Sequence, residues 1–259
     1  MTKPTGPNGV SFNQPCRKRD VVPDRGPALT DALILVKCKN QSPYYSNRPS
    51  PEKGTNLKTI IAASRNAHKI KEIETITAKF GMRVISRDEA GLPPEEIEET
   101  GATFEENSLL KARTICALSG QPTIADDSGL MVDYLDGAPG VYSARFAGED
   151  QNDRRNNEKL LKLLDGVPRE QRTAKFVSVV SLVFPDGEEL VARGECPGHM
   201  LTEYHGTGGF GYDPLFLPDG CEKTFAEMNA EEKNAVSHRA RALAVLEELL
   251  QARKQPADI

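Results

Sequence analysis

Apolar residues follow two different spacings in the segment 58–86. Residues 58–63 form a short apolar run with strand character. The next segment places apolar residues near helical spacing, at Ile70, Ile73, Ile76 and Phe80. Gly81 interrupts this pattern, and residues 82–86 again have strand character. The pattern predicts a β-α-β unit.

A second helix is predicted from residue 103 to about residue 118. Thr103 and Glu106 have the spacing of a capping box, in which the threonine caps the helix and the glutamate reaches back. We expect its apolar face at Leu110, Ala117 and Leu118.

Two adjacent carboxylates follow the next apolar run. Residues 122–125 lead into Asp126, Asp127, Ser128 and Gly129, so we expect the acids at the exit of a strand and a backbone turn at the glycine. Because side chains alternate along a strand, the two acids should point opposite ways. One carboxylate with a partner acid would suit Mg2+, which is usually held by one or two carboxylates plus phosphate oxygens. The alternative is an acidic surface turn.

The second half of the chain predicts an antiparallel ribbon between helices. Residues 152–164 have a leucine-lined helical face, whereas residues 172–184 and 189–193 form two strand-like runs around a turn at 185–187. A glycine-rich loop occupies residues 206–214. A terminal helix is expected over residues 237–253, with its apolar side at Leu243, Leu246, Leu249 and Leu250.

Composition is that of a soluble globular protein. The chain is 38% hydrophobic and 27% charged, and it contains no apolar run long enough for a membrane span. Its five cysteines are odd in number, are widely spaced and form no CxxC pair, so neither a disulfide framework nor a zinc site is indicated. We therefore expect a reducing, cytoplasmic location.

Charge is distributed unevenly between two regions. Residues 1–56 carry nine Lys/Arg against four Asp/Glu, and residues 57–259 carry 24 against 34. An acidic body argues against a nucleic-acid polymer as partner, because such binding depends on neutralising many phosphates. A small anionic ligand needs only a few local cations.

Residues 1–56 predict a disordered extension before a domain at 57–254. They hold eight of the 18 prolines and show no sustained period. A further hypothesis is that this segment is not translated. Translation would then begin at a codon such as that of Leu57, because the next methionine after Met1 is Met82.

Two segments offer groups that suit a nucleotide. Residues 64–69 combine a predicted helix start with a hydroxyl, an amide and an ammonium group, which suits phosphate, although capping alone would explain Ser64 and Asn66. The loop 206–214 lets a ligand approach the backbone and offers aromatic faces for a base, although a tight hairpin connection is the simpler explanation.

Further charged residues have two interpretations each. Lys233, His238 and Arg239 fit a solvated helix face, but positive side chains near a helix start oppose the dipole, which favours a function. Glu98 and Glu99 fit an acidic surface run or supply a second metal ligand.

Taken together, these segments closely resemble the inosine/xanthosine triphosphate pyrophosphatase family. The resemblance runs from about residue 57 to residue 250 in six ordered blocks. The blocks are Ser64, Asn66 and Lys69; residues 98–101 with Thr103, Phe104, Asn107 and Lys111; residues 125–130; residues 139–145; residues 208–214; and Lys233 with residues 237–239.

This resemblance implies a two-lobed α/β fold, with a mixed twisted sheet flanked by helices around a substrate cleft. It implies a homodimer that uses Mg2+ to hydrolyse dITP, ITP and XTP to the monophosphate and pyrophosphate, removing them from the nucleotide pool. Asp127 would be the proton acceptor and a magnesium ligand, with Glu99 as second ligand. The triphosphate would be held by Ser64, Arg65, Asn66, Ala67, His68, Lys69, Lys111 and Ser128. Base and sugar would be held by Phe210, Gly211, Tyr212, Asp213, Lys233, His238 and Arg239.

His238 and Arg239 would donate hydrogen bonds to the keto oxygen of a 6-keto purine. Adenine would present amino donors of its own and would leave the protein donors unpaired.

Three rival functions remain open: a related pyrophosphatase for modified pyrimidine or methylated nucleotides, an aspartyl-phosphate signalling module, and a nucleotide-binding regulator without hydrolysis.

Overall fold

In the computed structural model, which describes residues 58–94 and 97–254, six strands form one mixed sheet in the order β2-β1-β3-β4-β5-β6. The predictions for residues 1–56 lie outside the described residues. The strands are β1 (Lys58–Ala62), β2 (Met82–Ser86), β3 (Thr123–Val132), β4 (Thr173–Val183), β5 (Glu189–Met200) and β6 (Phe216–Pro218). The α-helices are α1 (Ala67–Thr77), α2 (Phe104–Ser119), α3 (Asp153–Leu163), α4 (Ala230–Val236) and α5 (His238–Lys254).

The sheet joins a parallel part to an antiparallel part. β2, β1 and β3 are parallel, with α1 between β1 and β2, whereas β3, β4, β5 and β6 are antiparallel neighbours. The predicted β-α-β unit and antiparallel ribbon are both present, although β5 extends seven residues beyond the predicted end at residue 193, to Met200. The expected α/β class with a mixed, helix-flanked sheet is confirmed.

Pairing between β1 and β3 covers only the first residues of β3. Its register joins Ile61 to Thr123 and Ala62 to Ile124 and then ends. From residue 125 onward, the edge of β3 that faces β1 is therefore not covered by a strand. The adjacent carboxylates begin at this point.

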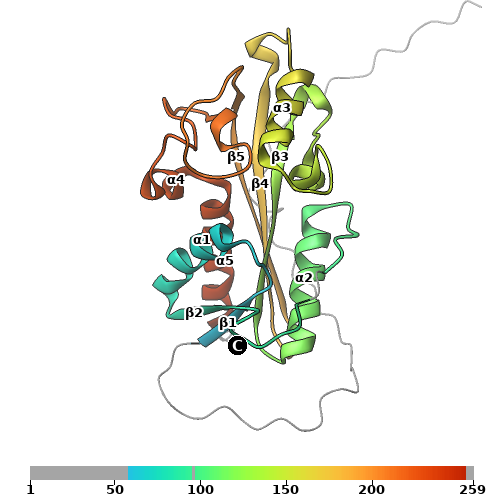
Figure 1. Ribbon diagram of the computed structural model, residues 1–259. Coiled ribbons are helices and arrows are strands. Elements are labelled where there is room, and N and C mark those ends of the chain that lie inside the picture. Colours follow the sequence, from blue (N-terminus) through green and yellow to red (C-terminus); the bar gives the residue numbers. More distant parts are fainter. Residues whose placement is uncertain (1–57, 95–96, 255–259) are drawn as a thin grey trace, which may run out of the picture. The chain divides into compact units, whose positions relative to one another are not determined.

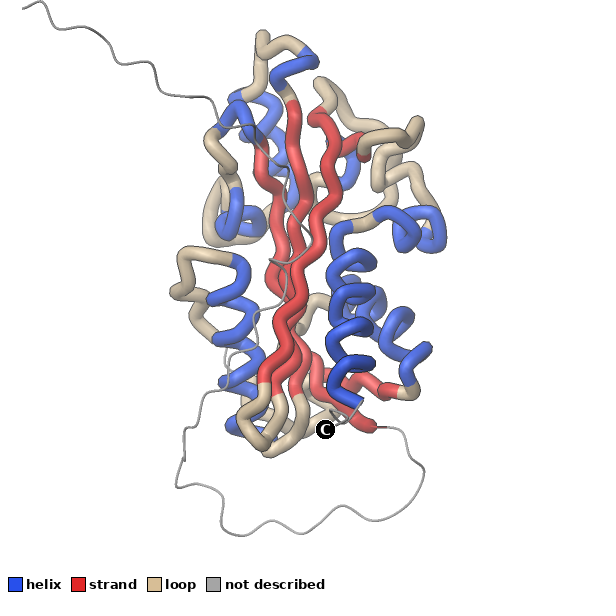
Figure 2. Tube along the Cα trace, turned by 180° about the vertical axis from the view of Figure 1, so that it is seen from behind, coloured by secondary structure: helices blue, strands red, loops and turns tan. Residues whose placement is uncertain are grey.

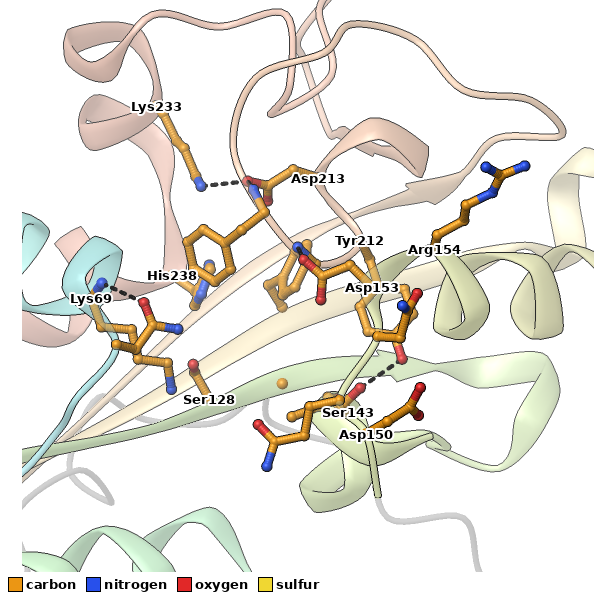
Figure 3. Close-up of a pocket in the computed structure, with 18 residues that line it drawn as sticks. Lys69, Ser128, Ser143, Asp150, Asp153, Arg154, Tyr212, Asp213, Lys233 and His238 are labelled. Atoms are coloured by element: carbon orange, nitrogen blue, oxygen red, sulfur yellow. Dashed lines mark hydrogen bonds and ion pairs between the residues drawn. The ribbon is translucent and has the colours of Figure 1, made fainter. Parts of the chain in front are cut away.

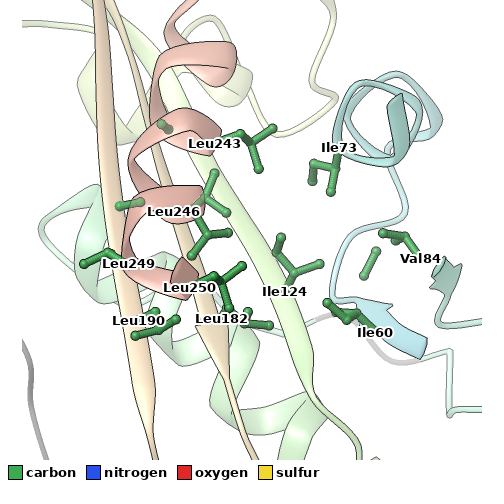
Figure 4. Packing of buried hydrophobic residues seen from close by; sticks show 14 residues of the cluster. Ile60, Ile73, Val84, Ile124, Leu182, Leu190, Leu243, Leu246, Leu249 and Leu250 are labelled. Carbon is green, nitrogen blue, oxygen red and sulfur yellow. The ribbon is translucent and has the colours of Figure 1, made fainter. Parts of the chain in front are cut away.

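Helices cover the long strands on two sides (Figures 1 and 2). The predicted leucines of α5 pack onto Ile124, Leu182 and Leu190 of the sheet, and Ile73 of α1 joins the same cluster (Figure 4). A second cluster lies further along β3, β4 and β5 and includes Leu130, Phe176 and Met200. The same three strands therefore serve both clusters.

Gly194 lets α5 lie directly on β5. A Cβ atom at this position would stand 2.2 Å from the amide nitrogen of Ala242 and 2.2 Å from the carbonyl oxygen of His238. Such distances are well inside van der Waals contact, so only glycine fits without displacing the helix. This contact fixes the beginning of α5, where His238 and Arg239 lie.

The apolar face predicted for α2 is wrong. Leu118 is 47% exposed and Ala117 is exposed as well, whereas Ala112, Ile115 and Cys116 are buried against the sheet. The side of α2 that faces the sheet is therefore a different one from the side predicted. The cap is as predicted at Thr103, whose side chain accepts a hydrogen bond from the Glu106 amide, but the Glu106 carboxylate accepts from Ala102.

The expected strand end at the paired acids is also wrong, because β3 continues through them to Val132. Gly129 does not make a turn. A Cβ there would stand 2.4 Å from Ser143 Oγ and 2.5 Å from the Gly140 carbonyl oxygen, both on the 3-10 helix η3 (Gly140–Arg145). The glycine is therefore needed for the close approach of η3 to β3.

No helix within residues 58–94 and 97–254 combines the length and apolar content needed to cross a bilayer. Cys116, Cys196 and Cys221, the cysteines of this part of the chain, are free thiols.

Candidate active site

Asp126 lies at the centre of a buried ion cluster. Its Oδ2 is 2.9 Å from Lys69 Nζ and 3.1 Å from an Nη of Arg239, and Ser178 donates to its Oδ1. Burial alone would raise the pKa of this carboxyl, but the charges of Arg239 and Lys69 hold its pKa well below the usual range. Asp126 is therefore the shared anionic partner of Lys69 and Arg239.

Asp127 points to the opposite face of β3, as the strand alternation predicts. Its Oδ1 is 2.8 Å from Lys111 Nζ, and the same nitrogen is 2.8 Å from Glu99 Oε1. The Oδ2 atom of Asp127 is buried and has no hydrogen-bond partner in the described part of the chain. Two carboxylates thus share one ammonium group, and one carboxylate oxygen remains available to a ligand.

The pKa values of the two acids move in opposite directions. Burial raises the pKa of Asp127, although Lys111 and Lys69 oppose the shift. Burial would raise the pKa of Glu99, but the charge and hydrogen bond of Lys111 and the charges of Lys69 and Arg145 together lower it. A carboxylate with a raised pKa is a better proton acceptor than an ordinary one.

A cavity of about 680 Å³ opens on the Asp126 side of β3 (Figure 3). Of the predicted site residues, those lining it are Asn66, Lys69, Ser128, Phe210, Gly211, Tyr212, Asp213, Lys233 and His238. Asp127, Glu99 and Lys111 do not line it. Lys69 links the two groups, since it contacts Asp126 directly and its charge also acts on Asp127 and Glu99.

The predicted phosphate segment forms the start of α1. Ser64 Oγ accepts a hydrogen bond from the Asn66 amide at 3.1 Å, and Asn66 Oδ1 accepts from the Lys69 amide at 3.2 Å. Both side chains therefore make capping contacts. Arg65 and Ala67 are exposed outside the lining of the cavity, and His68 lies in the first helical turn.

The glycine-rich loop is held around Asp213. Its Oδ2 accepts hydrogen bonds from Lys233 Nζ at 2.7 Å and from the Phe210 amide at 3.0 Å. Gly209 has a φ of 72°, and a Cβ there would lie 2.0 Å from the same oxygen, so only glycine fits. Burial raises the pKa of Asp213, and Lys233 opposes this shift. Lys233 Nζ also lies 4.9 Å from the centre of the Phe210 ring.

His238 is buried and stacks on Phe176, with 4.8 Å between ring centroids and 13° between the planes. Burial, and next the charge of Arg239, lower its pKa well below the usual range, so the imidazole is neutral near pH 7. Its Nδ1 has no hydrogen-bond partner among the described residues. A neutral ring that borders the cavity can exchange hydrogen bonds with a ligand.

Arg239 is only 1% exposed and does not line the cavity. Its guanidinium contacts Asp126, Ser128 and Glu72. These contacts place it beneath the floor of the cavity, where it holds Ser128 and Asp126 in position.

Several supporting residues gave no separate signal in the sequence. Asp153 accepts from the Gly211 amide at 2.7 Å, Asn157 donates to the Gly211 carbonyl at 2.8 Å, and the Tyr212 hydroxyl donates to the Ser143 carbonyl at 2.8 Å. Arg145 lies 3.6 Å from Glu99. Ser143 and Arg145 belong to a block that carried the family resemblance, whereas Asp153 and Asn157 could only be assigned to a helix.

Lysine ammonium groups and carboxylates line one cavity beside a mixed α/β sheet. Such a combination is typical of enzymes that act on phosphate compounds. A model of the Ham1 family matches residues 60–249. The chain belongs to the Ham1 family.

Relatives with established names support this assignment. The dITP/XTP pyrophosphatase of Clostridium perfringens is 50% identical over 200 residues, which cover 75% of this chain and 98% of that protein. The protein of the same name from Escherichia coli O157:H7 is 46% identical over 192 residues, covering 73% and 96%. The solved Ham1 protein of Staphylococcus aureus is 41% identical, with a TM-score of 0.69, and covers 76% of this chain and 100% of that one. The predicted family and enzyme class, a nucleoside-triphosphate pyrophosphatase, are confirmed.

Proposed function

We propose that this chain hydrolyses deaminated purine nucleoside triphosphates, namely dITP, ITP and XTP, to the monophosphate and pyrophosphate, with Mg2+ as cofactor. The observation that carries the proposal is the buried, unpartnered Oδ2 of Asp127 beside Lys111 and Glu99. The names of the bacterial relatives support the substrate class. On this proposal the enzyme clears these nucleotides from the pool as a homodimer, as the family resemblance implies. Its cysteine content supports a location in the cytoplasm.

Asp127 and Glu99 would hold the metal. Carboxylate oxygens suit Mg2+, and two of them suffice when phosphate oxygens and water complete the shell. No group of three or more His, Cys, Asp or Glu side chains suited to a metal occurs within residues 58–94 and 97–254, which is consistent with such a sparse site. Bound Mg2+ would neutralise phosphate charge and activate water.

Asp127 would take a proton from the attacking water. The water oxygen bonds to phosphorus while the bond between the α-phosphorus and the bridging oxygen of the leaving pyrophosphate breaks. Lys111 forms ion pairs with both Asp127 and Glu99, and Lys69, paired with Asp126, lines the cavity. These cations, with Ser128 and the residues 64–69, would bind the phosphate oxygens.

The base and sugar would bind at the glycine-rich loop. The Phe210 ring offers a stacking face, and the Lys233 ammonium and the neutral His238 ring border the same cavity. A keto group at position 6 can accept a hydrogen bond there, whereas an amino group cannot. In this state Arg239 is held by Asp126 and Glu72, so a direct contact with the base requires it to exchange partners.

The test is pyrophosphate release by the full chain from ITP, XTP, dITP, GTP and ATP, with Mg2+ or with EDTA. Metal-dependent release from the first three substrates, and little from GTP and ATP, is the expected result. If none of the five is favoured, the same assay is repeated with modified pyrimidine and methylated nucleotides, and release from one of these would assign a different sanitising activity. Nucleotide binding without any release would make the protein a regulator. Light scattering of the same sample measures its molar mass and so tests whether the chain is a homodimer.

A further inference from the structure

A second cavity of about 410 Å³ shares none of its lining residues with the first. Its walls come from the turn before β4, the end of β5 and the segment after β6. Its lining includes Val167, Arg169, Arg172, Thr224, Glu222 and Glu227. None of them has a role in the proposed reaction.

Arg172 is the buried charge of this cavity. It is 7% exposed, and its Nε donates a hydrogen bond to the Val167 carbonyl oxygen at 2.7 Å. Across residues 58–94 and 97–254, its guanidinium forms no ion pair with a carboxylate, and its two terminal nitrogens donate no hydrogen bond to a protein acceptor. Burial of a charged side chain is costly unless the charge is paired and its donors are hydrogen-bonded.

Arg239 is a second buried guanidinium of this chain and can be compared with Arg172. Its charge is matched by Asp126 and Glu72. Buried charges are normally paired, because an isolated one loses its hydration without compensation. Arg172 has no such carboxylate partner among the described residues. We therefore expect its counter-charge to come from a bound anion.

The acids at this cavity do not supply that partner. The Glu227 carboxylate accepts hydrogen bonds from the Thr224 amide at 2.8 Å and from the Thr224 hydroxyl at 3.1 Å, which holds it on its own segment. Glu222 is exposed and forms no ion pair with Arg172. These acids at the cavity also disfavour a large polyanion.

We infer that this cavity binds a small oxyanion, a phosphate or a carboxylate, through the guanidinium of Arg172. The planar fork of donors on arginine matches both groups, and the exposed Arg169 adds positive charge nearby. The volume admits a small ligand rather than a polymer.

The test follows the arginine Nε–H signals of the full chain by NMR while inorganic phosphate or, separately, acetate is added. The Arg172 signal is the one missing from Arg172→Gln. It should shift and saturate with one of the two anions, which identifies the source. Arg172→Gln should weaken binding at this cavity by about tenfold or more, since it removes charge-assisted hydrogen bonds. In this variant the titration follows the Nε–H signal of Arg169, which lines the same cavity and is the signal missing from Arg169→Gln. Arg169→Gln is the matched control on the same turn and should retain most of the affinity.

Three results would overturn the inference. The Arg172 signal could stay unchanged with both anions, or it could drift without saturation, which indicates an adventitious ion only. It could also change with protein concentration and not with anion, which would assign the counter-charge to a second copy of this chain. If Arg172→Gln does not fold, Arg172→Lys identifies the same signal, and the titration of the unaltered chain decides.

Discussion

Asp126 and Asp127 are neighbours in sequence, yet their carboxylates bind different lysines on opposite faces of β3. Lys69 Nζ lies 2.9 Å from Asp126 Oδ2, and Lys111 Nζ lies 2.8 Å from Asp127 Oδ1. The first carboxylate is ion-paired with both Lys69 and Arg239, whereas the second keeps an unpartnered oxygen among the described residues. Substitution of the two acids should therefore affect different properties.

Asp126→Asn should lower the free energy of unfolding by about 3–5 kcal/mol, because it leaves Arg239 and Lys69 without their shared anion. Urea denaturation measures the change. Asp127→Asn is the control and should cost much less, since Lys111 keeps Glu99 as a partner and burial already disfavours the charge on Asp127. Equal losses in both variants would contradict the assignment.

Asp127→Asn should reduce kcat by about 100-fold or more while nucleotide binding largely survives, because it removes the proposed proton acceptor. Steady-state pyrophosphate release and equilibrium binding of ITP measure the two effects. Asp136→Asn is a matched control, since Asp136 is exposed at a φ of 51°, which asparagine tolerates. Near-normal turnover of Asp127→Asn would remove this residue from the mechanism.

Glu99→Gln should raise the Mg2+ concentration needed for half-maximal activity by about tenfold or more, because an amide is a weaker ligand than a carboxylate. Mg2+ binding measured by calorimetry in the absence of nucleotide gives a second readout. Glu98→Gln changes an exposed neighbour in the same way and should leave both values unchanged. If the two variants behave alike, Glu99 is no ligand.

His238 should make the folded state less stable in mild acid. Its pKa is lowered on folding by burial, so below about pH 6.5 the unfolded chain binds a proton that the folded chain does not. The free energy of unfolding therefore falls as pH drops from about 7 toward the folded-state pKa. His238→Gln should lose this contribution, and the difference between the two proteins should be constant above pH 7. If the difference in the free energy of unfolding between the unaltered chain and His238→Gln stays the same below pH 7, His238 makes no pH-dependent contribution to stability.

Gly194→Ala should lower the free energy of unfolding by about 1–3 kcal/mol and raise KM, because the added methyl group displaces the start of α5. Thermal unfolding and steady-state kinetics measure the two effects. Arg193→Ala on the same strand removes only surface ion pairs and should cost about 1 kcal/mol or less. An unchanged KM in Gly194→Ala would show that this contact does not position His238.

Local patterns were sufficient for most of the elements. The β4–β5 hairpin and α5 follow from a Val/Phe-rich run, a turn at 185–187 and four leucines at helical spacing. The buried face of α2 did not follow. The side that packs on the sheet carries Ala112, Ile115 and Cys116, whereas Leu118 lies on the exposed side. Which side of a helix meets the sheet depends on the tertiary packing, which a weak apolar pattern does not determine.

The site was predictable where its residues are close in sequence. The opposite orientation of Asp126 and Asp127 follows from strand alternation alone. The length of β3 did not, because the role of Gly129 depends on Ser143 and Gly140, which reach it only in the folded chain. For the same reason the sequence could not show that Arg239 is enclosed by Asp126 and Glu72 and lies beneath the cavity.

The three long strands link the regions proposed to bind the two ends of the nucleotide. β3, β4 and β5 contribute to the cluster that includes Ile73 of α1 and also to the one that includes Tyr212 of the glycine-rich loop. The separation between Lys69 and Phe210 is therefore set by one continuous hydrogen-bonded frame. A ligand that contacts both must have a matching length. The sheet would thus select nucleotides by the number of their phosphates as well as by their base.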